Sequence, residues 1–267
     1  LTLHDIIFMG DVNFKGTAYQ NFGNIYRKMV VPRAIKNARK IITVSEYEKN
    51  IIVDRCKIHP DKIAVIYNAV AEKFKPITGE TRLQQFKQQY RLPDKFLLHL
   101  GNTAPKKNTP ALIAAYVEYC NHSDAPLPLV IADYPQALVM RVLKKLKRED
   151  LAAKFNFPGH VPVDDMPLLY NCCSLFIYPS LEESFGLPVL EAMASGVPVL
   201  ASSIPALLEI AGDAVKYVDP RDVSAMAAAI SDMLRTQHDY VQRGLLHVQS
   251  FSWEKSAKQL LQIYQNI

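Results

Sequence analysis

The sequence predicts an α/β protein built from parallel β-sheets, and two observations support this. Short, continuously apolar runs, typical of strands covered on both faces, recur along the chain at residues 40–44, 63–67, 96–100, 129–131, 175–178, 198–201 and 214–218. Stretches of helical length separate many of these runs, at residues 109–121, 136–149, 165–172, 188–194, 222–235 and 252–265. Strand and helix therefore alternate almost throughout, which is the pattern of repeated βαβ units.

Length and composition narrow the class of protein. With 267 residues, of which 49% are hydrophobic, the chain is long enough for two domains and too apolar to be disordered. Its net charge of +5 suits phosphorylated small molecules or an anionic membrane surface, and it is too diffuse to indicate a nucleic-acid partner. The four cysteines form no C-x-x-C pair, which favours reduced thiols in a cytosolic protein over a zinc site.

The beginning of the chain and its apolar runs bear on its extent and location. Leu1 is not an initiator methionine, and residues 6–8 are typical of the end of a strand, so we expect the natural N-terminus to be missing. No apolar run approaches the roughly 18 residues that a membrane-spanning helix needs.

Local signals predict several helix ends. Ser45 and Glu48 form a capping box, in which the serine side chain accepts from a free backbone amide and the glutamate reaches back. Pro188 can occupy the first turn of its helix without losing a hydrogen bond, and Gly196 suits the position after the helix end. The polar stretch from 71 to 95 has few strand signals, and we interpret it as a linker between two domains.

The strongest chemical signal is the loop of residues 179–193, which follows one predicted strand and leads into a helix. Parallel α/β sheets bind ligands at the carboxyl ends of their strands, so this loop belongs at the functional edge. Gly186 allows a ligand to approach the backbone closely, and the helix N-terminus offers free amides to an anion. We place Glu191 in the first helical turn, and together with Glu183 it could accept hydrogen bonds from sugar hydroxyls. For either glutamate alone an ordinary surface charge is the preferred interpretation, but for the whole loop it is not.

Two weaker signals accompany this loop. Lys106 and Lys107 follow a strand that ends at Gly101, and lysine is a compact charge suited to phosphate oxygens. Paired lysines before a helix are more often a solvated surface. His4 could move a proton near neutral pH, although a lone histidine is more often structural. A G-x-G-x-x-G fingerprint and a P-loop are both absent, which argues against a dehydrogenase and a P-loop NTPase.

The segment from Glu183 to Glu191, E-S-F-G-L-P-V-L-E, resembles the E-x7-E signature of the family 4 glycosyltransferases. Further matches follow the family order and cover nearly the whole chain; they are residues 2–5, 44–46, 65–68, 101–108, 157–161 and 251–254. Mannosyltransferase-like bacterial members share the T-L-H-D and P-K-N patterns.

The resemblance implies a GT-B fold, in which two Rossmann-like domains face each other across a cleft. On this pattern residues 1–75 are the C-terminal part of the N-terminal, acceptor-side domain, which would be incomplete in this chain. Residues 76–245 are the domain that binds the nucleotide-sugar donor. Residues 246–267 form a C-terminal helix that crosses back to the first domain.

The resemblance also implies roles for individual residues. Glu183 matches the glutamate that holds hydroxyls of the donor sugar near the reacting carbon, and Glu191 matches the one that binds the ribose. Lys107 matches the lysine on the diphosphate, and stabilising the charge on that leaving group is the largest electrostatic task. Further matches are His4 in the cleft, Gly101, Asn102 and Lys106 in the phosphate loop, His160 and Val161 with Gly159 beside the base, and the backbone of Phe185, Gly186 and Leu187 at the sugar and diphosphate.

Three residues depart from the family pattern. Asn102 replaces a small or basic residue, which puts the first phosphate contact in doubt. Lys106 stands where arginine is usual and gives up bidentate geometry. Ala132-Asp133 stands where many relatives have glycine after the strand, which leaves this wall of the pocket undefined.

The implied reaction moves a sugar from a nucleoside diphosphate sugar, linked to GDP, UDP or dTDP, to a glycan or lipid-linked acceptor, with retention of anomeric configuration. No cofactor and no metal are expected, and the chain has no Asp-x-Asp motif. The pathway implied is bacterial cell-surface polysaccharide synthesis. Two alternatives stay open, namely a nucleotide-sugar-binding module without transferase activity and a GT-B epimerase or hydrolase.

Membrane contact is a separate question. Between residues 19 and 40, apolar and basic side chains are mixed; they are Tyr19, Phe22, Tyr26, Met29 and Val30 with Arg27, Lys28, Arg33, Lys36, Arg39 and Lys40. Such a segment could rest on the inner face of the plasma membrane, or it could be an ordinary amphipathic helix packed on its own sheet. The expected location is cytoplasmic in either case.

Overall fold

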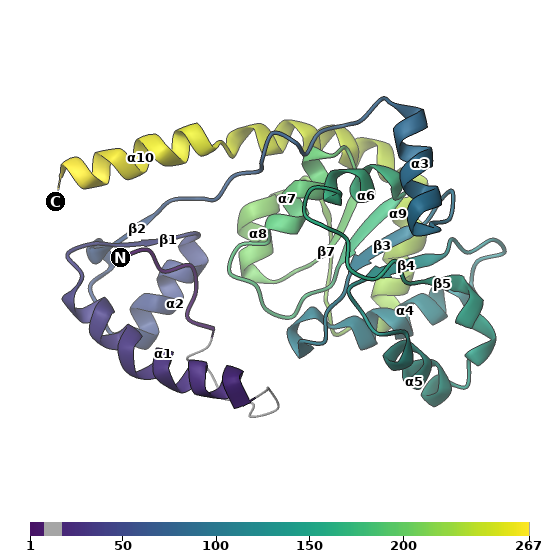
Figure 1. Ribbon diagram of the computed structural model, residues 1–267, viewed down its shortest axis with the longest axis horizontal. Coiled ribbons are helices and arrows are strands. Elements are labelled where there is room, and N and C mark those ends of the chain that lie inside the picture. The colour runs from purple at the N-terminus through teal and green to yellow at the C-terminus, as the bar shows by residue number, and fades with distance from the viewer. Residues whose placement is uncertain (8–17, 267) are drawn as a thin grey trace. The chain divides into compact units, whose positions relative to one another are not determined.

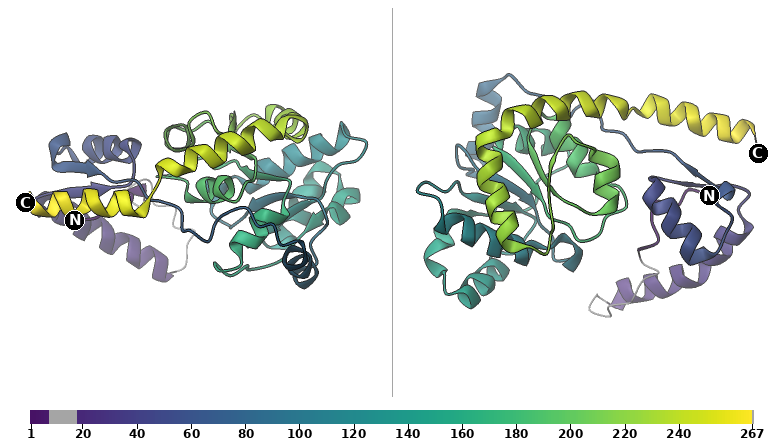
Figure 2. Two further views of the ribbon diagram at one scale, coloured as in Figure 1. Left: turned by 90° about the horizontal axis from the view of Figure 1, so that it is seen from above. Right: turned by 180° about the vertical axis from the view of Figure 1, so that it is seen from behind.

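The computed structural model describes residues 1–7 and 18–266, without the side chains of residues 18–25 and 237. Two compact units make up the chain (Figures 1 and 2). One consists of Leu1–Ala69 together with Phe251–Ile267, and the other of Val70–Ser250. Each unit has its own hydrophobic core, and the two are described separately.

The second unit is built on a fully parallel sheet. The strands are β3 (Leu97–Leu100), β4 (Leu129–Ala132), β5 (Phe155–Asn156), β6 (Leu175–Tyr178), β7 (Val199–Ser202) and β8 (Lys216–Val218). Among the described residues their order is β5-β4-β3-β6-β7-β8. Leu97 of β3 pairs with Leu129 of β4 on one side and with Leu175 of β6 on the other. The prediction of an α/β fold with a parallel sheet is confirmed.

Helices cover both faces of this sheet (Figure 1). One layer contains α4 (Thr109–Asn121), α5 (Gln136–Leu146) and the long α9 (Val223–His247), and side chains from all three share a core with strand residues such as Leu97 and Ile131. The other layer includes α3 (Glu80–Tyr90), α6 (Met166–Cys172), α7 (Leu187–Ala194) and α8 (Pro205–Ala211). In this layer Tyr170 of α6 packs edge-on against Phe176 of β6.

Several helix ends follow the local sequence signals. Pro188 lies in the first turn of α7. Gly196 follows the end of that helix with a φ of +75°, a backbone angle that favours glycine. Both positions agree with the prediction.

The structure corrects the interpretation of residues 71–95 as a linker. Helix α3 lies inside this stretch and packs against α6, and Phe86 is its buried residue. The helix is polar apart from this contact, so its apolar pattern is too weak to distinguish it from a loop. The short strand β5 and helix α8 were not predicted, and α9 extends 12 residues beyond the predicted end at 235, to His247.

The first unit contains a two-stranded parallel sheet of β1 (Ile41–Thr43) and β2 (Ile63–Val65), with helices α1 (Ala18–Asn37), α2 (Glu46–Cys56) and α10 (Trp253–Gln265). Thr2 bridges to Ile42, so the beginning of the chain runs parallel to β1. The described core of the unit gathers six buried side chains, Leu3, Ile6, Ile35, Ile41, Ile52 and Ile63.

The predicted serine cap of α2 is confirmed. The Ser45 side chain accepts from the Glu48 amide at 3.0 Å, as predicted. The Glu48 carboxylate is buried and accepts from the backbone amide of Ile6 at 2.9 Å. Glu48 therefore fixes the segment that carries His4 to the beginning of α2.

Candidate functional site

Three side chains of the second unit meet at the carboxyl end of its sheet. The ammonium of Lys107 lies 2.7 Å from Oε1 of Glu183, and it donates to the hydroxyl of Tyr178 at 2.8 Å. The same hydroxyl donates to Glu183 Oε1 at 2.8 Å. The Lys107 ammonium also lies over the Tyr178 ring, 4.8 Å from its centroid. The Lys107 and Glu183 side chains are only 16% and 11% exposed.

The fold brings these residues together from adjacent strands. Lys107 closes a short 3-10 helix, Pro105–Lys107, that follows β3, whereas Tyr178 ends the neighbouring β6. The two loops are joined by a hydrogen bond from the Leu181 amide to the Lys106 carbonyl, at 2.7 Å. The Asn108 side chain donates to Pro179 and Pro220 carbonyls and so fixes the beginning of α4 to two neighbouring loops.

Electrostatics keep Glu183 ionised. Burial is the largest single effect and would raise its pKa, and the charge and hydrogen bond of Lys107 are the main effects that oppose it. The Lys106 charge and the Tyr178 hydroxyl act in the same direction, so the pKa of Glu183 lies below its usual value. The site thus holds a fixed carboxylate beside a fixed ammonium, an arrangement that can bind hydroxyl and phosphate groups at once.

The loop after Glu183 turns sharply at Gly186, which precedes α7 with a φ of +97°. The backbone angle favours glycine here, and a Cβ on Gly186 would also displace the end of the Leu207 side chain. Phe185 is buried, and Leu187 is the first residue of α7. The side chain of Phe185 therefore packs inside the unit.

Glu191 lies further along α7 than predicted. The helix begins at Leu187, so Glu191 falls in its second turn, and the expected interaction with the helix N-terminus does not apply. Its carboxylate instead accepts from the hydroxyl of Tyr170 at 3.1 Å. Burial raises the pKa of Glu191, against the opposing effects of the Tyr170 hydrogen bond and the Lys73 charge. The pKa values of the two signature glutamates are therefore shifted in opposite directions, downward for Glu183 and upward for Glu191.

The phosphate loop begins tightly packed against β4. A Cβ on Gly101 would lie 2.8 Å from Ile131 Cγ2 and from Tyr134 Cβ, which leaves room for glycine alone. The Asn102 side chain accepts from the Ala104 amide at 2.9 Å and thereby shapes the turn. Asn102, one of the residues that depart from the family pattern, thus has a local structural role.

Asp133 and His160 lie beside each other at the carboxyl ends of β4 and β5. The His160 Nδ1 is 3.1 Å from Asp133 Oδ1, and both side chains are solvent-accessible. The Asp133 amide donates to the Gly159 carbonyl at 3.0 Å. Val161, next along the chain, is buried.

His4 belongs to the first unit and is described there by itself. Its side chain is exposed, next to Asp5, whose carboxylate accepts from the Ile7 amide at 3.1 Å. Among the other predicted site residues, Lys107 and Glu183 are in direct contact. Glu191 lies on α7, the helix that follows the loop containing Glu183.

Sequence analysis missed three residues of this region, namely Tyr178, Tyr170 and His99. All three are fully or almost fully buried and lie within apolar runs, where a pattern indicates a strand or a helix but no chemistry. His99 joins β3 to β6 and α4, with its ring nitrogens 3.1 Å from the Ile177 carbonyl and 3.0 Å from Thr109 Oγ1. Burial lowers the pKa of His99 to about 4.

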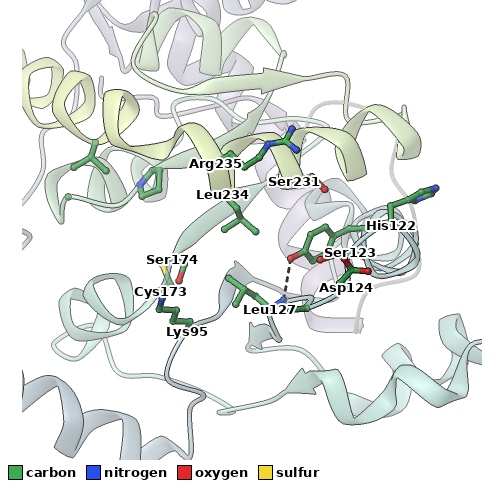
Figure 3. A pocket seen from close by; sticks show the side chains of 15 residues that line it. Lys95, His122, Ser123, Asp124, Leu127, Cys173, Ser174, Ser231, Leu234 and Arg235 are labelled. Carbon is green, nitrogen blue, oxygen red and sulfur yellow. Dashed lines mark hydrogen bonds between the residues drawn. The ribbon is translucent and has the colours of Figure 1, made fainter.

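A pocket of about 710 Å³ lies elsewhere in the second unit (Figure 3). Four of its lining residues, Lys95, Leu127, Ser174 and Pro198, lie just before β3, β4, β6 and β7. The pocket therefore opens at the amino ends of the strands, whereas the glutamates and lysines described above follow the carboxyl ends. Despite its size, this pocket is therefore not part of the candidate site.

Comparison with known families gives two matches. Residues 80–244 match the model described as "Glycosyl transferases group 1", which is more than half of the chain. Residues 1–74 match the model described as "Glycosyltransferase Family 4".

Similar proteins of known name include two from Escherichia coli. The O-antigen chain mannosyltransferase B is 30% identical over 246 residues, which cover 90% of this chain and 64% of that protein. The serotype-specific mannosyltransferase WbdA is 31% identical over 267 residues, which cover 95% of this chain and 32% of that protein. The chain thus spans less than two thirds of either relative.

Solved structures show the same fold. The Anabaena protein HepE, determined in complex with UDP and glucose, superposes with a TM-score of 0.77 at 19% identity, over 100% of this chain and 71% of HepE. A glycosyltransferase from Rickettsia africae superposes with a TM-score of 0.75 at 20% identity, over 99% of this chain and 69% of that one. The predicted GT-B type of α/β fold is confirmed.

Proposed function

The chain belongs to the group 1 glycosyltransferases, and from this premise we propose that it transfers a hexose from a nucleoside diphosphate sugar to a glycan or lipid-linked acceptor. The cluster of Lys107, Tyr178 and Glu183 supports this proposal best, because it places a largely buried cation and carboxylate in contact at the carboxyl end of a parallel sheet, where α/β proteins bind ligands. The similarity to O-antigen mannosyltransferases favours mannose as the sugar and cell-surface polysaccharide synthesis as the pathway.

Each charged group has a task in this reaction. Lys107, with Lys106 beside it, stabilises the negative charge on the departing diphosphate. Glu183 accepts hydrogen bonds from hydroxyls of the donor sugar, and Glu191 from those of the ribose. The backbone at Asn102, Gly186 and Leu187 lies along the same strand ends and supplies amide donors, whereas the Gly101 amide donates to the Ala132 carbonyl at 2.9 Å and shapes the loop. For His4, in the first unit, the proposal is contact with the donor sugar or the acceptor.

The reaction proposed retains the anomeric configuration. The bond from the anomeric carbon to the phosphate oxygen breaks, and a bond from that carbon to the acceptor oxygen forms on the same face. The acceptor proton passes to the departing phosphate oxygen, so no side chain has to act as a base. No metal ion is needed in this scheme, because Lys107 and the backbone amides balance the charge on the diphosphate.

Peripheral membrane contact through α1 is a further part of the proposal. Val31 and Ile35 of this helix pack into the core of the first unit. Tyr26 and Met29 are 61% and 60% exposed, among exposed basic residues such as Arg33. Tyr19 and Phe22 lie where side chains are not described. No described helix combines the length and apolar character that crossing a bilayer requires. Exposed apolar and basic side chains together favour binding to anionic lipid.

The donor site is tested by calorimetric titration with GDP, UDP and dTDP and with their mannose and glucose conjugates. We expect selective binding of one nucleotide, weakened by Lys107→Ala and Glu191→Ala. Lys144→Ala, on the exposed side of α5, is the matched control and should bind normally. Binding of none of these ligands would contradict the proposal.

Transfer is tested separately, with radiolabelled donor sugar and a polysaccharide acceptor. Incorporation of label that Lys107→Ala reduces about a hundredfold supports a transferase. Donor binding without incorporation favours the binding module without activity, and release of free sugar without acceptor favours a hydrolase.

Membrane contact is tested by sedimentation of the protein with lipid vesicles. More protein should sediment with anionic vesicles than with neutral vesicles, and Met29→Glu should abolish this difference.

A further inference from the structure

His99 is a polar side chain buried inside the parallel sheet of the second unit. It lies on β3 and is 0% exposed. Strand β3 pairs with β4 as far as Leu100, but its pairing with β6 ends at Leu98. The His99 ring bonds to the next residue of β6, with Nδ1 3.1 Å from the Ile177 carbonyl. A side chain therefore joins β3 to β6 where the backbone pairing of the two strands stops.

The order of the strands reverses between β3 and β6. From β3 the chain continues to β4 and β5 on one side of the sheet, and from β6 it continues to β7 and β8 on the other. Parallel α/β sheets bind ligands beyond the carboxyl ends of the strands at this kind of position. The loops that carry Lys107 and Glu183 follow these two strands. A bond between β3 and β6 at this point therefore bears on how the two loops are placed.

The partners of the His99 ring determine which nitrogen carries the hydrogen. A carbonyl oxygen only accepts, so Nδ1 donates to Ile177. The ring is neutral, because burial and, to a smaller extent, the charge of Lys107 lower the pKa of His99 to about 4. Nε2 therefore accepts from the Thr109 hydroxyl, at 3.0 Å. One ring thus donates to β6 and accepts from the first residue of α4.

The contact between His99 and Thr109 closes the base of the loop that follows β3. Thr109 is buried, and Lys107 lies in this loop, two residues before it. The Lys107 ammonium donates to the Tyr178 hydroxyl at 2.8 Å, and Tyr178 directly follows Ile177. The two partners of His99 are thus close in sequence to the two ends of the contact between Lys107 and Tyr178. An apolar residue in place of His99 would suit the strand but would make neither bond.

We propose that His99 is a positioning residue that holds the loop after β3 to β6 through Thr109, and so places the Lys107 ammonium for the diphosphate. This inference rests on the proposed function, because that function puts the diphosphate at Lys107. His99 is fully buried and acts through its two partners, without contact to substrate. Asn108 also fixes the beginning of α4, so loss of the Thr109 bond should loosen the loop without unfolding the protein.

The test uses calorimetric titrations of the full chain with GDP and GMP, UDP and UMP, and dTDP and dTMP. For each base, the ratio of diphosphate to monophosphate affinity isolates the contribution of the second phosphate. Lys107→Ala should lower this ratio, so that the ratio reports the contact made by Lys107. Thr109→Val removes the hydroxyl that bonds to His99 and should lower the ratio about fivefold to tenfold. Thr109→Ser keeps the hydroxyl and should retain the original ratio.

Two further variants keep the test decisive. His99→Asn keeps an N–H for the Ile177 carbonyl but is too short to reach Thr109, so it should lower the ratio as well. It serves if Thr109→Val does not fold. Thr43→Val is the matched control, because Thr43 is a fully buried threonine of the first unit whose hydroxyl has no hydrogen-bond partner among the described residues. Thr43→Val should leave the ratio unchanged.

The possible outcomes separate this inference from the proposed function. A ratio that Lys107→Ala lowers, but that Thr109→Val and His99→Asn leave unchanged, would overturn the role of His99 and leave the diphosphate site intact. An equal loss of affinity for both nucleotides in Thr109→Val, or an equal fall of the ratio in Thr43→Val, would indicate a general structural effect and overturn it too. A ratio that Lys107→Ala leaves unchanged, or binding of no nucleotide, would contradict the proposed function and this inference with it.

Discussion

Lys107 and Glu183 form a largely buried ion pair, with 2.7 Å between Nζ and Oε1, and the Tyr178 hydroxyl contacts both partners. Under the proposed function, the diphosphate competes with Glu183 for the Lys107 ammonium. Glu183 is then free to accept from the hydroxyls of the sugar on the same ligand. The pair thus couples binding of the diphosphate to binding of the sugar.

Removing one partner of this pair should destabilise the fold. Lys107→Met leaves the Glu183 carboxylate buried without its cation, and we expect a loss of about 3 kcal/mol in the free energy of unfolding. The double variant Lys107→Met/Glu183→Gln removes both charges and should regain most of this stability without regaining transfer. Denaturant unfolding at pH 7 measures both effects.

The exposed pair Lys258–Glu254 provides the control for this experiment, with its side chains 72% and 76% exposed. Lys258→Met should change stability by no more than about 0.5 kcal/mol. Equal losses in Lys107→Met and Lys258→Met would mean that burial of the Lys107–Glu183 pair has no energetic consequence.

The two tyrosines that contact the glutamates should have separable effects. Tyr178→Phe removes a hydrogen bond to the charged Glu183, and we expect about a tenfold lower kcat/KM with little change in nucleotide affinity. Tyr170→Phe removes the bond to Glu191 at the proposed ribose site, so it should weaken nucleotide binding instead. Steady-state kinetics combined with calorimetry on both variants tests this separation.

Identical behaviour of the two variants in both measurements would contradict distinct roles for Glu183 and Glu191. Each substitution removes one hydroxyl from a nearly fully buried ring, so the variants are matched in packing as well as in chemistry. A general loss of stability would therefore affect both alike.

The sequence predicted the sheet and the position of the signature loop, because continuous apolar runs and a glycine-proline boundary are local features. It could not predict that Tyr170 contacts Glu191, since these residues lie on different helices and only packing brings them together. Helix α3 was missed for a related reason, because its packing depends on Phe86 rather than on a repeated apolar pattern. The contact between Asp133 and His160 likewise depends on strand order, which no local pattern provides.

Gly186→Ala should destabilise the fold. It places an alanine at a φ of +97°, and its Cβ would displace the end of the Leu207 side chain. We expect a cost of about 1–2 kcal/mol for the backbone, and a smaller additional cost for moving Leu207. Gly159→Ala is the control, because its φ is +75° but nothing lies within 4 Å of the added Cβ. Thermal unfolding should show a larger loss of stability for Gly186→Ala than for Gly159→Ala. Adding Leu207→Ala to the Gly186→Ala variant should remove the part of this loss that the contact causes.

Transfer should not depend on a divalent metal ion. Lys107 and backbone amides balance the charge on the diphosphate in the proposed scheme, so treatment with EDTA followed by dialysis should leave kcat unchanged. Lys107→Ala should remain defective when magnesium or manganese is added. Loss of transfer after chelation, with recovery on adding one metal, would contradict the scheme.

His99 should make the fold sensitive to acid. Burial lowers the pKa of His99 to about 4, whereas the unfolded chain protonates near the ordinary value of 6.5. Below pH 6.5 the unfolded state binds a proton that the folded state does not, so stability falls with pH until the folded state also protonates near pH 4. The shift corresponds to about 3 kcal/mol across this window.

The measurement is denaturant unfolding at several pH values between 4 and 7. His99→Gln should be less stable at pH 7, because it alters the bonds to Ile177 and Thr109, but its stability should vary less with pH. His122→Gln is the control, since His122 is exposed at the end of α4 and should leave the pH profile unchanged. Parallel profiles for the original chain and His99→Gln would show that other groups cause the acid sensitivity.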